Sequence, residues 1–190
     1  MSGLVRKLSL FLVLCPLLIG GCSNDPVDEY YENDKKFYDI RAYFDNQINK
    51  LKVRRQNVRK QITKNGRSHV LEMNTLNWVE ELEAFKESDI NKPAWRDAYL
   101  TDTIFLEGSQ VISHKAVNTE NPIQTLVVTI HSETGDCLRV SIDKRTENFL
   151  YSSEQKLFYS AGEGYEISGK LSVKFLFNSE YEVEAEFIDG

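Results

Sequence analysis

Cysteine is scarce in this sequence, and its positions exclude a disulfide-stabilised fold. The chain of 190 residues has three cysteines, and Cys15 and Cys22 lie in an N-terminal segment interpreted below as an export signal. Cys137 is then alone in the part that folds, so no disulfide is expected within it. It lies at the expected start of a strand, with no histidine-bearing motif beside it. We therefore interpret Cys137 as a structural residue and not as a nucleophile.

Catalytic and metal-binding motifs are missing as well. The sequence has no Gly-x-Ser-x-Gly elbow, no phosphate loop ending in Gly-Lys-Ser/Thr and no His-Glu-x-x-His. The three histidines, His69, His114 and His131, are far apart, and none has a second ligand at metal-site spacing. His131 alternates with the apolar residues of its segment and is expected on the solvent face. The sequence therefore predicts no catalytic residue, no metal and no cofactor, and an enzyme of unknown class remains the third functional alternative.

Positive charge is in deficit. The chain has 23 Lys and Arg against 29 Asp and Glu, a net charge of −6. Loss of an N-terminal signal with Arg6 and Lys7 leaves 21 against 29, or −8. This acidity argues against nucleic acid as a partner.

The N-terminus has the order of a bacterial export signal. Arg6 and Lys7 precede an apolar run that is shorter than the ~20 residues of a membrane-spanning helix and contains Pro16. The run ends in Leu-Ile-Gly-Gly-Cys, which resembles the lipobox of bacterial lipoproteins. We expect cleavage between Gly21 and Cys22 and lipidation of Cys22, and two or three acyl chains make a stable anchor. The predicted organisation is a signal peptide over residues 1–21, a lipidated Cys with a short tether over 22–29, and a single globular domain over 30–190.

The first half of that domain predicts helices around one hairpin. A first helix is expected to begin at Asp25-Pro26 or at Asn33-Asp34 and to end near Leu51. Asn65-Gly66 predicts a two-residue turn in a hairpin over residues 58–73. A second helix is expected over residues 78–87, with one further helical turn over 91–95. The residues expected on the buried helix faces are Phe37, Ile40, Phe44, Ile48 and Leu51, then Trp78, Val79, Leu82 and Phe85.

From Tyr99 onward the apolar period is two, which is typical of antiparallel strands. Pairing apolar residues across each hairpin sets Ile130 opposite Leu138 and Phe177 opposite Tyr181, with loops at 133–135 and 178–180. Weaker strands are expected near 111–117, 147–152 and 156–162. The predicted fold is α+β: the N-terminal helix, the β-hairpin and the second helix pack on a curved antiparallel sheet of about seven strands.

Three charged or glycine-rich features have both a functional and a structural interpretation. Glutamates alternate along residues 180–186, and we interpret them as a solvated strand face partly neutralised by Lys170 and Lys174. The basic run over residues 50–60 suits anionic lipid heads, or simply an exposed helix end. Gly162-Glu163-Gly164 is a faint phosphate-binding fragment that we interpret as a turn.

Residues 87–97 and 148–157, the Asn-Gly hairpin and the ending over residues 181–187 resemble a family of uncharacterised outer-membrane lipoproteins of the Bacteroidota. The resemblance implies a location and no chemistry. Asp25, Asp28 and Glu29 match loosely the acidic signal by which such organisms export some lipoproteins to the cell surface.

Together these features predict an outer-membrane lipoprotein, with the periplasmic face favoured over the cell surface. The leading function is non-enzymatic, in binding or envelope assembly. The expected partners are the membrane, through Cys22, and an envelope protein or apolar ligand. The alternative is a carrier of lipid or another apolar ligand in a half-barrel cavity lined by residues such as Phe175, Phe177 and Tyr181.

Overall fold

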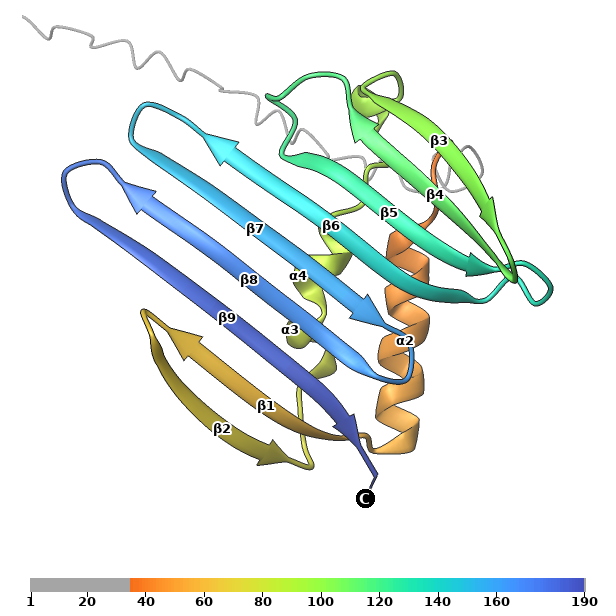
Figure 1. Cartoon of the computed structure of the whole chain (residues 1–190), viewed down its shortest axis with the longest axis horizontal. Helices are drawn as coiled ribbons and strands as arrows, with labels where there is room; N and C mark the ends of the chain where they lie inside the picture. The colour runs from red at the N-terminus through yellow and green to blue at the C-terminus, as the bar shows by residue number, and fades with distance from the viewer. Residues whose placement is uncertain (1–34, 190) are drawn as a thin grey trace, which may run out of the picture.

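A computed structural model describes residues 35–189, which form one antiparallel sheet of nine strands with helices on one of its faces (Figure 1). The α+β prediction is confirmed, and the strands number nine where about seven are predicted. In chain order the elements are α2 (Ile40–Arg54), β1 (Asn57–Lys64), β2 (Arg67–Met73), α3 (Trp78–Glu81), α4 (Glu83–Lys86), the 3-10 turn η1 (Pro93–Trp95), β3 (Tyr99–Leu106), β4 (Ser109–Ala116), β5 (Ile123–His131), β6 (Cys137–Glu147), β7 (Tyr151–Ser160), β8 (Gly164–Val173) and β9 (Phe177–Ile188).

The strand order is β2-β1-β9-β8-β7-β6-β5-β4-β3. Strands β3 to β9 follow one another as a meander, because each is joined to the next by a short turn. The N-terminal hairpin β1–β2 then continues the sheet beside β9, with Ile62 opposite Val183. Residues from the two ends of the described chain therefore lie side by side (Figure 1).

Helix α2 packs along the sheet through the apolar face that its spacing predicts. Phe37, Ile40, Phe44, Ile48 and Leu51 are all buried. The helix begins later than predicted: residues 35–39 are not helical, and the Asp39 carboxylate caps it by accepting from the Ala42 N–H at 3.0 Å. The predicted caps at Asp25 and Asn33-Asp34 lie outside the described residues.

The Asn65-Gly66 hairpin has the predicted register. Lys64 pairs with Arg67 and Val58 with Met73, and Arg59 forms an ion pair with the opposing Glu72, with an Nη2–Oε1 distance of 3.1 Å. Asn65 and Gly66 both have positive φ, as a type I′ turn requires. A local turn signal was therefore sufficient to set this register.

The segment predicted as one helix over residues 78–87 is two short helices. Leu82 has φ −104° and ψ 7°, which interrupts the helix between α3 and α4. Trp78, Leu82 and Phe85 are buried as predicted, whereas Val79 is 43% exposed and the prediction for it is wrong. The break turns Phe85 toward Phe44, with ring centroids 4.9 Å apart, so tertiary packing overrides the single helical period. The predicted helical turn near Trp95 is confirmed as η1.

The core lies between the helices and the nearer half of strands β5–β9. Tyr159 and Tyr165, fully buried there, keep their hydroxyls satisfied: Tyr159 donates to Gln47 at 3.2 Å, and Tyr165 donates to Glu81. Lys60 also binds Glu81, at 2.7 Å. In β5–β6, Val128 faces Val140 and Leu126 faces Ile142, as the prediction requires. A bulge then sets Ile130 opposite Cys137 in place of Leu138, so the buried side chain is Cys137.

Two strand predictions at the far end of the sheet are wrong. The loop between β8 and β9 is residues 174–176 and not 178–180, so Val173 faces Phe177 and Tyr181 faces Gly169. The predicted strand over 147–152 contains the turn between β6 and β7. The loop prediction assumed that every apolar side chain is buried. The helices cover one end of β6–β9 only, and the other end extends past them (Figure 1).

Candidate functional site

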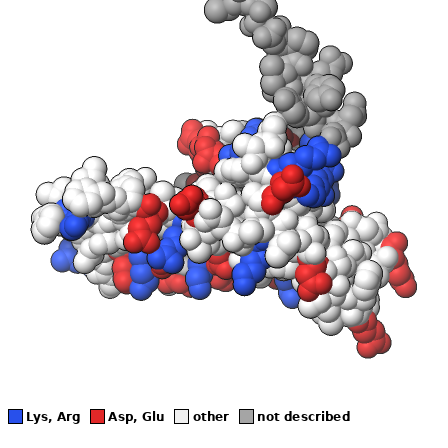
Figure 2. All heavy atoms as spheres, turned by 90° about the horizontal axis from the view of Figure 1, so that it is seen from above, with Lys and Arg blue, Asp and Glu red and all other residues white. Residues whose placement is uncertain are grey.

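The uncovered end of β6–β9 carries an exposed apolar surface, which we call the apolar tip. Two turns form it side by side, β6–β7 and β8–β9. Phe175 is 94% exposed and Phe149 80% exposed. In Figure 2 this end of the molecule, at the left, is largely uncharged, whereas acidic and basic groups alternate along the rest of the visible edge. The members of the apolar tip are Phe149, Leu150, Tyr151, Phe175, Leu176 and Phe177.

Hydrogen bonds hold the two turns together in a fixed shape. The Lys174 N–H of one turn donates to the Leu150 carbonyl of the other at 2.9 Å. Within the first turn, the Asn148 side-chain oxygen accepts from the backbone N–H groups of Leu150 and Tyr151, at 2.8 and 3.0 Å. The exposed side chains therefore project from a structured support.

Lys174 supplies the positive charge of the tip. Its Nζ atom lies 4.5 Å from the Phe149 ring centroid and 5.4 Å from that of Phe175. Such cation–π contacts hold an ammonium beside aromatic rings while leaving it in water. The prediction that Lys174 neutralises the glutamates of β9 is therefore wrong, because the side chain lies in the turn and not on the facing strand.

Phe175 has φ +64°, a left-handed conformation that a bulky side chain adopts at a cost of about 1–2 kcal/mol. The conformation directs the ring away from the sheet, which agrees with its exposure. An aromatic residue in a strained and exposed position is a signal of function more than of folding.

Cys137 and the three histidines, for which the sequence predicts no catalytic role, lie on different strands of the sheet. Burial raises the pKa of the Cys137 thiol, which keeps it protonated, and the Tyr43 hydroxyl donates to the Cys137 carbonyl at 3.4 Å. His131 lies at the end of β5, where its Nδ1 atom accepts from the N–H groups of Glu133 and Thr134 at 3.3 and 3.4 Å. His69 is exposed on the edge strand β2.

His114 is buried, which the sequence did not indicate. Its Nδ1 atom is 2.8 Å from the Thr101 hydroxyl, and its Nε2 atom has no hydrogen-bond partner among residues 35–189. Burial lowers the pKa of this imidazole, so the ring stays neutral. The ring packs edge-on against Phe37, 5.2 Å between centroids, within the core.

The glutamates of β9 and the glycine-rich fragment have the structural roles predicted for them. The glutamates of β9 lie on the sheet face opposite the helices, where Glu180 binds Lys170 at 3.0 Å and Glu186 binds Arg59 at 3.4 Å. Gly162 and Glu163 lie in the turn between β7 and β8, and Gly164 begins β8. The basic run spans the end of α2 and the start of β1, and its lipid interpretation stays a prediction.

Residues 35–189 contain no group of three or more His, Cys, Asp or Glu side chains placed to hold a metal ion. Among the helices of this same part of the chain, none has the length and apolarity to cross a membrane.

The predicted lipidation site at Cys22 and the cleavage site at Gly21 lie outside the described residues. The resemblance to Bacteroidota lipoproteins stays a prediction. Comparison of the chain with protein-family models, with curated proteins and with solved structures finds no match.

Proposed function

We propose that this chain is a lipid-anchored envelope protein that binds and does not catalyse, and that its apolar tip enters the surface of the bilayer that holds Cys22. The observation that carries the proposal is the exposure of the tip. Single exposed apolar residues are ordinary on proteins, but a contiguous cluster on two adjoining turns marks an interaction surface.

The shape and composition of the tip favour a bilayer over a protein groove as the occupant. Phe175 and Leu176 project from the end of a sheet, and a deformable apolar medium accepts such a projection without a complementary pocket. Aromatic residues with a neighbouring Lys are the composition found at membrane interfaces, where rings enter the acyl boundary and the ammonium remains at the headgroups. Burying one such apolar side chain contributes about 1.5–3 kcal/mol.

The predicted anchor brings the bilayer within reach. The 12 residues between Cys22 and Lys35 span at most about 45 Å. A tethered domain meets its membrane at high effective concentration, so a weak insertion of a few side chains suffices to orient it. The open polar face of the sheet is then held in a fixed direction toward other envelope components.

The carrier alternative has less support. Phe175 and Phe177, which were expected to line a cavity, lie at the exposed tip. Tyr181 borders a hollow of about 460 Å³, but charged side chains such as Lys156, Lys170 and Glu154 line it, and the hollow is open to solvent. An apolar ligand requires a more enclosed and less charged site.

Tryptophan fluorescence of the lipidated protein in phosphatidylcholine vesicles tests the insertion. Phe175→Trp places a reporter at the tip. Phe105→Trp is the matched control, because Phe105 is also largely exposed, at 75%, but lies on the edge strand β3 and not in the turns of the tip. We expect brominated lipid to quench the added fluorescence in Phe175→Trp and not in Phe105→Trp, after subtraction of the signal from Trp78 and Trp95. Equal quenching at the two positions would argue against insertion of the tip.

For the location we propose the outer membrane, with the domain on its periplasmic side. The support is the lipobox-like sequence ending in Gly21-Cys22, followed by Ser23. Density-gradient fractionation of the envelope, with protease added to intact and to permeabilised cells, tests both points. Recovery with the inner membrane, or digestion in intact cells, would contradict them.

A further inference from the structure

A second surface feature lies on the helix side of the sheet, away from the apolar tip. It is a hollow of about 380 Å³. The first turn of α2, the segment from α4 to η1, the start of β5 and the C-terminal part of β6 surround it. We call it the basic hollow. Its lining residues are Arg41, Glu87, Lys92, Trp95, Pro122, Ile123 and Lys144.

The basic hollow has an excess of positive charge in an acidic protein. Arg41, Lys92 and Lys144 face a single carboxylate, Glu87. None of these four groups forms an ion pair within 4.0 Å with any other part of residues 35–189. The local balance of about +2 contrasts with −6 for the whole chain.

Lys144 is the least solvated of the three cations. It is half-buried on β6, on the helix-facing side, two residues from the fully buried Ile142. Burial lowers the pKa of Lys144, and the neighbouring Lys92 lowers it further, against the opposing effect of Glu87. A cation that is partly removed from water beside a second cation costs free energy unless an anion compensates it.

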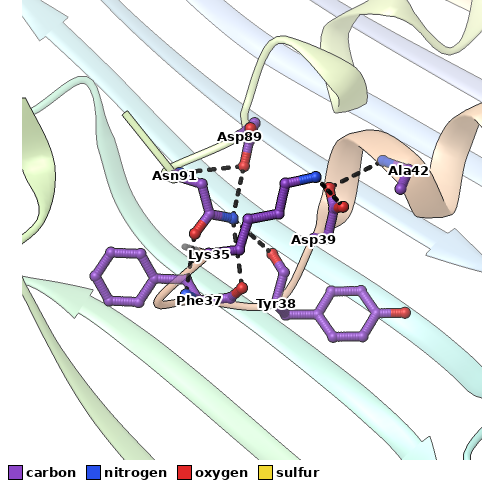
Figure 3. Close-up of polar contacts among 7 residues, drawn as sticks. All are labelled: Lys35, Phe37, Tyr38, Asp39, Ala42, Asp89 and Asn91. Atoms are coloured by element: carbon purple, nitrogen blue, oxygen red, sulfur yellow. Dashed lines mark hydrogen bonds and ion pairs between the residues drawn. The ribbon is translucent and has the colours of Figure 1, made fainter. Parts of the chain in front are cut away.

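A clamp around Asn91 fixes the hollow in advance of any ligand (Figure 3). The Asn91 side-chain oxygen accepts from the Phe37 N–H at 3.0 Å, and its amide donates to the carbonyls of Phe37 and Tyr38 at 3.4 and 3.3 Å. Asp89, nearly buried, accepts from the same amide at 3.1 Å. The clamp joins the chain just before Arg41 to the residue just before Lys92.

Trp95 completes the arrangement from the other side. The Lys92 Nζ atom lies 4.2 Å from the Trp95 ring centroid, so the ammonium is held at the wall of the hollow. Trp95, Pro122 and Ile123 add an apolar wall next to the cations. Fixed cations beside a flat apolar wall are what an anion with an organic body requires.

We propose that the basic hollow binds a phosphomonoester, with Arg41, Lys92 and Lys144 on the phosphate and the wall around Trp95 on the esterified group. A phosphomonoester carries about −1.5 to −2 at pH 7, which matches the local excess, and a guanidinium binds it through two parallel hydrogen bonds. A monocarboxylate brings half that charge. The inference is independent of the apolar tip and of lipidation.

Isothermal titration of the full lipidated protein in detergent at 150 mM salt tests the site, with phenyl phosphate as the probe and benzoate as its carboxylate counterpart. We expect phenyl phosphate to bind at least about tenfold more tightly than benzoate. Lys144→Met keeps the apolar stem of the side chain and removes its charge. It should lower the affinity for phenyl phosphate by about tenfold, since one charge-assisted contact contributes about 1.4 kcal/mol or more. Lys50→Met is the matched control, because it removes the same charge from an exposed position on α2.

The outcomes are separable from a folding defect. Without ligand, Lys144→Met should raise Tm by about 2 °C or more, because it removes an uncompensated cation. The proposal is overturned if phenyl phosphate does not bind, if benzoate binds equally well, or if Lys50→Met weakens binding as much as Lys144→Met.

The source of the phosphomonoester is addressed with vesicles that contain phosphatidic acid. If these vesicles recruit more protein than phosphatidylcholine vesicles do, and Lys144→Met abolishes the difference, the ligand is a lipid headgroup. Binding of phenyl phosphate without such recruitment identifies a soluble ester. If the apolar tip does not insert, the difference in phenyl phosphate binding between the wild type and Lys144→Met is unaffected. The proposals for the apolar tip and for the basic hollow can therefore fail independently.

Discussion

The Tyr181 ring of β9 lies across Gly169 of β8, so close that a Cβ atom at residue 169 would come within 2.7 Å of the ring. The Tyr181 hydroxyl accepts a hydrogen bond from the Gln155 amide at 2.7 Å, which extends the contact to β7. The ring thus covers the glycine just beyond the helices, and an aromatic residue packed on a strand glycine fixes the local register.

Gly169→Ala should therefore destabilise the protein by about 1–3 kcal/mol, because the methyl group displaces the Tyr181 ring. Residue 169 does not have positive φ, so the backbone adds no strain. In a Tyr181→Ala background the same substitution should cost little or nothing. Urea unfolding of the four proteins in this double-mutant cycle measures the coupling. Costs that simply add would show that the ring and the glycine are not in contact.

Among the glycines of residues 35–189, Gly164 has the least room for a side chain. It has φ +153°, and a Cβ atom there would lie 2.0 Å from the Ala185 carbonyl oxygen of β9. Because this obstacle is backbone, Gly164→Ala should prevent folding or cost more than about 3 kcal/mol. Gly162→Ala, in the turn just before β8, is the control: no atom lies within 4 Å of a Cβ atom there, and only its φ of +81° adds about 1 kcal/mol. Equal unfolding free energies for the two variants would contradict the close approach of β8 and β9.

His114 makes stability depend on pH. Its pKa in the folded protein lies below the ordinary 6.5, because the ring is buried. As pH falls through about 6.5, the imidazole of the unfolded chain binds a proton, whereas the buried imidazole of the folded protein stays neutral. The contribution of His114 to the unfolding free energy is therefore fully present above this pH and is lost below it. We expect the unfolding free energy to fall by about 1 kcal/mol more in the wild type than in His114→Gln between pH 7 and 5.5.

The control for this titration is His69→Gln on the exposed strand β2, which should keep the wild-type slope. Chemical denaturation at each pH gives the slopes. If His114→Gln and the wild type lost stability in parallel, the buried ring would not be the group that titrates.

Cys22→Ala tests the anchor. We propose that this thiol accepts the diacylglycerol, and the described core lies downstream, so the variant should fold but remain unprocessed and should not be tethered through acyl chains. Membrane partition and the mass difference between precursor and mature protein are the measurements. A variant that is still cleaved after Gly21 and still requires detergent would show that the tether is not at Cys22.

Local signals explain which parts of the fold were predicted correctly. The Asn65-Gly66 turn sets the β1–β2 register without reference to the rest of the molecule. The five apolar residues expected on the first helix were identified by their spacing, and all are buried: four lie in α2, and Phe37 lies just before it. The α-then-β order was enough for the fold class, but it contains no information on strand order, so the pairing of β1 with β9 was not predicted.

The errors arise where tertiary context decides. The register of β8–β9 was predicted by requiring that Phe175 and Phe177 be buried, yet these residues lie past the helices that would cover them. The same assumption assigned them to a cavity and not to the apolar tip. The basic hollow was missed because Arg41, Lys92 and Lys144 are each unremarkable in their local sequence, and only the fold brings them together.

The position of β9 in the sheet has a consequence for the order in which the molecule is completed. Residues 177–188 are the last strand in the sequence, yet they form the seam between the N-terminal hairpin and the meander. Because a chain is synthesised from its N-terminus, α2 and the β1–β2 hairpin can form early, but β1 has no partner on its second edge until β9 is available. Such long-range closure delays completion of the sheet until the last strand is available, and until then the free edge of β1 is open to pairing with other chains.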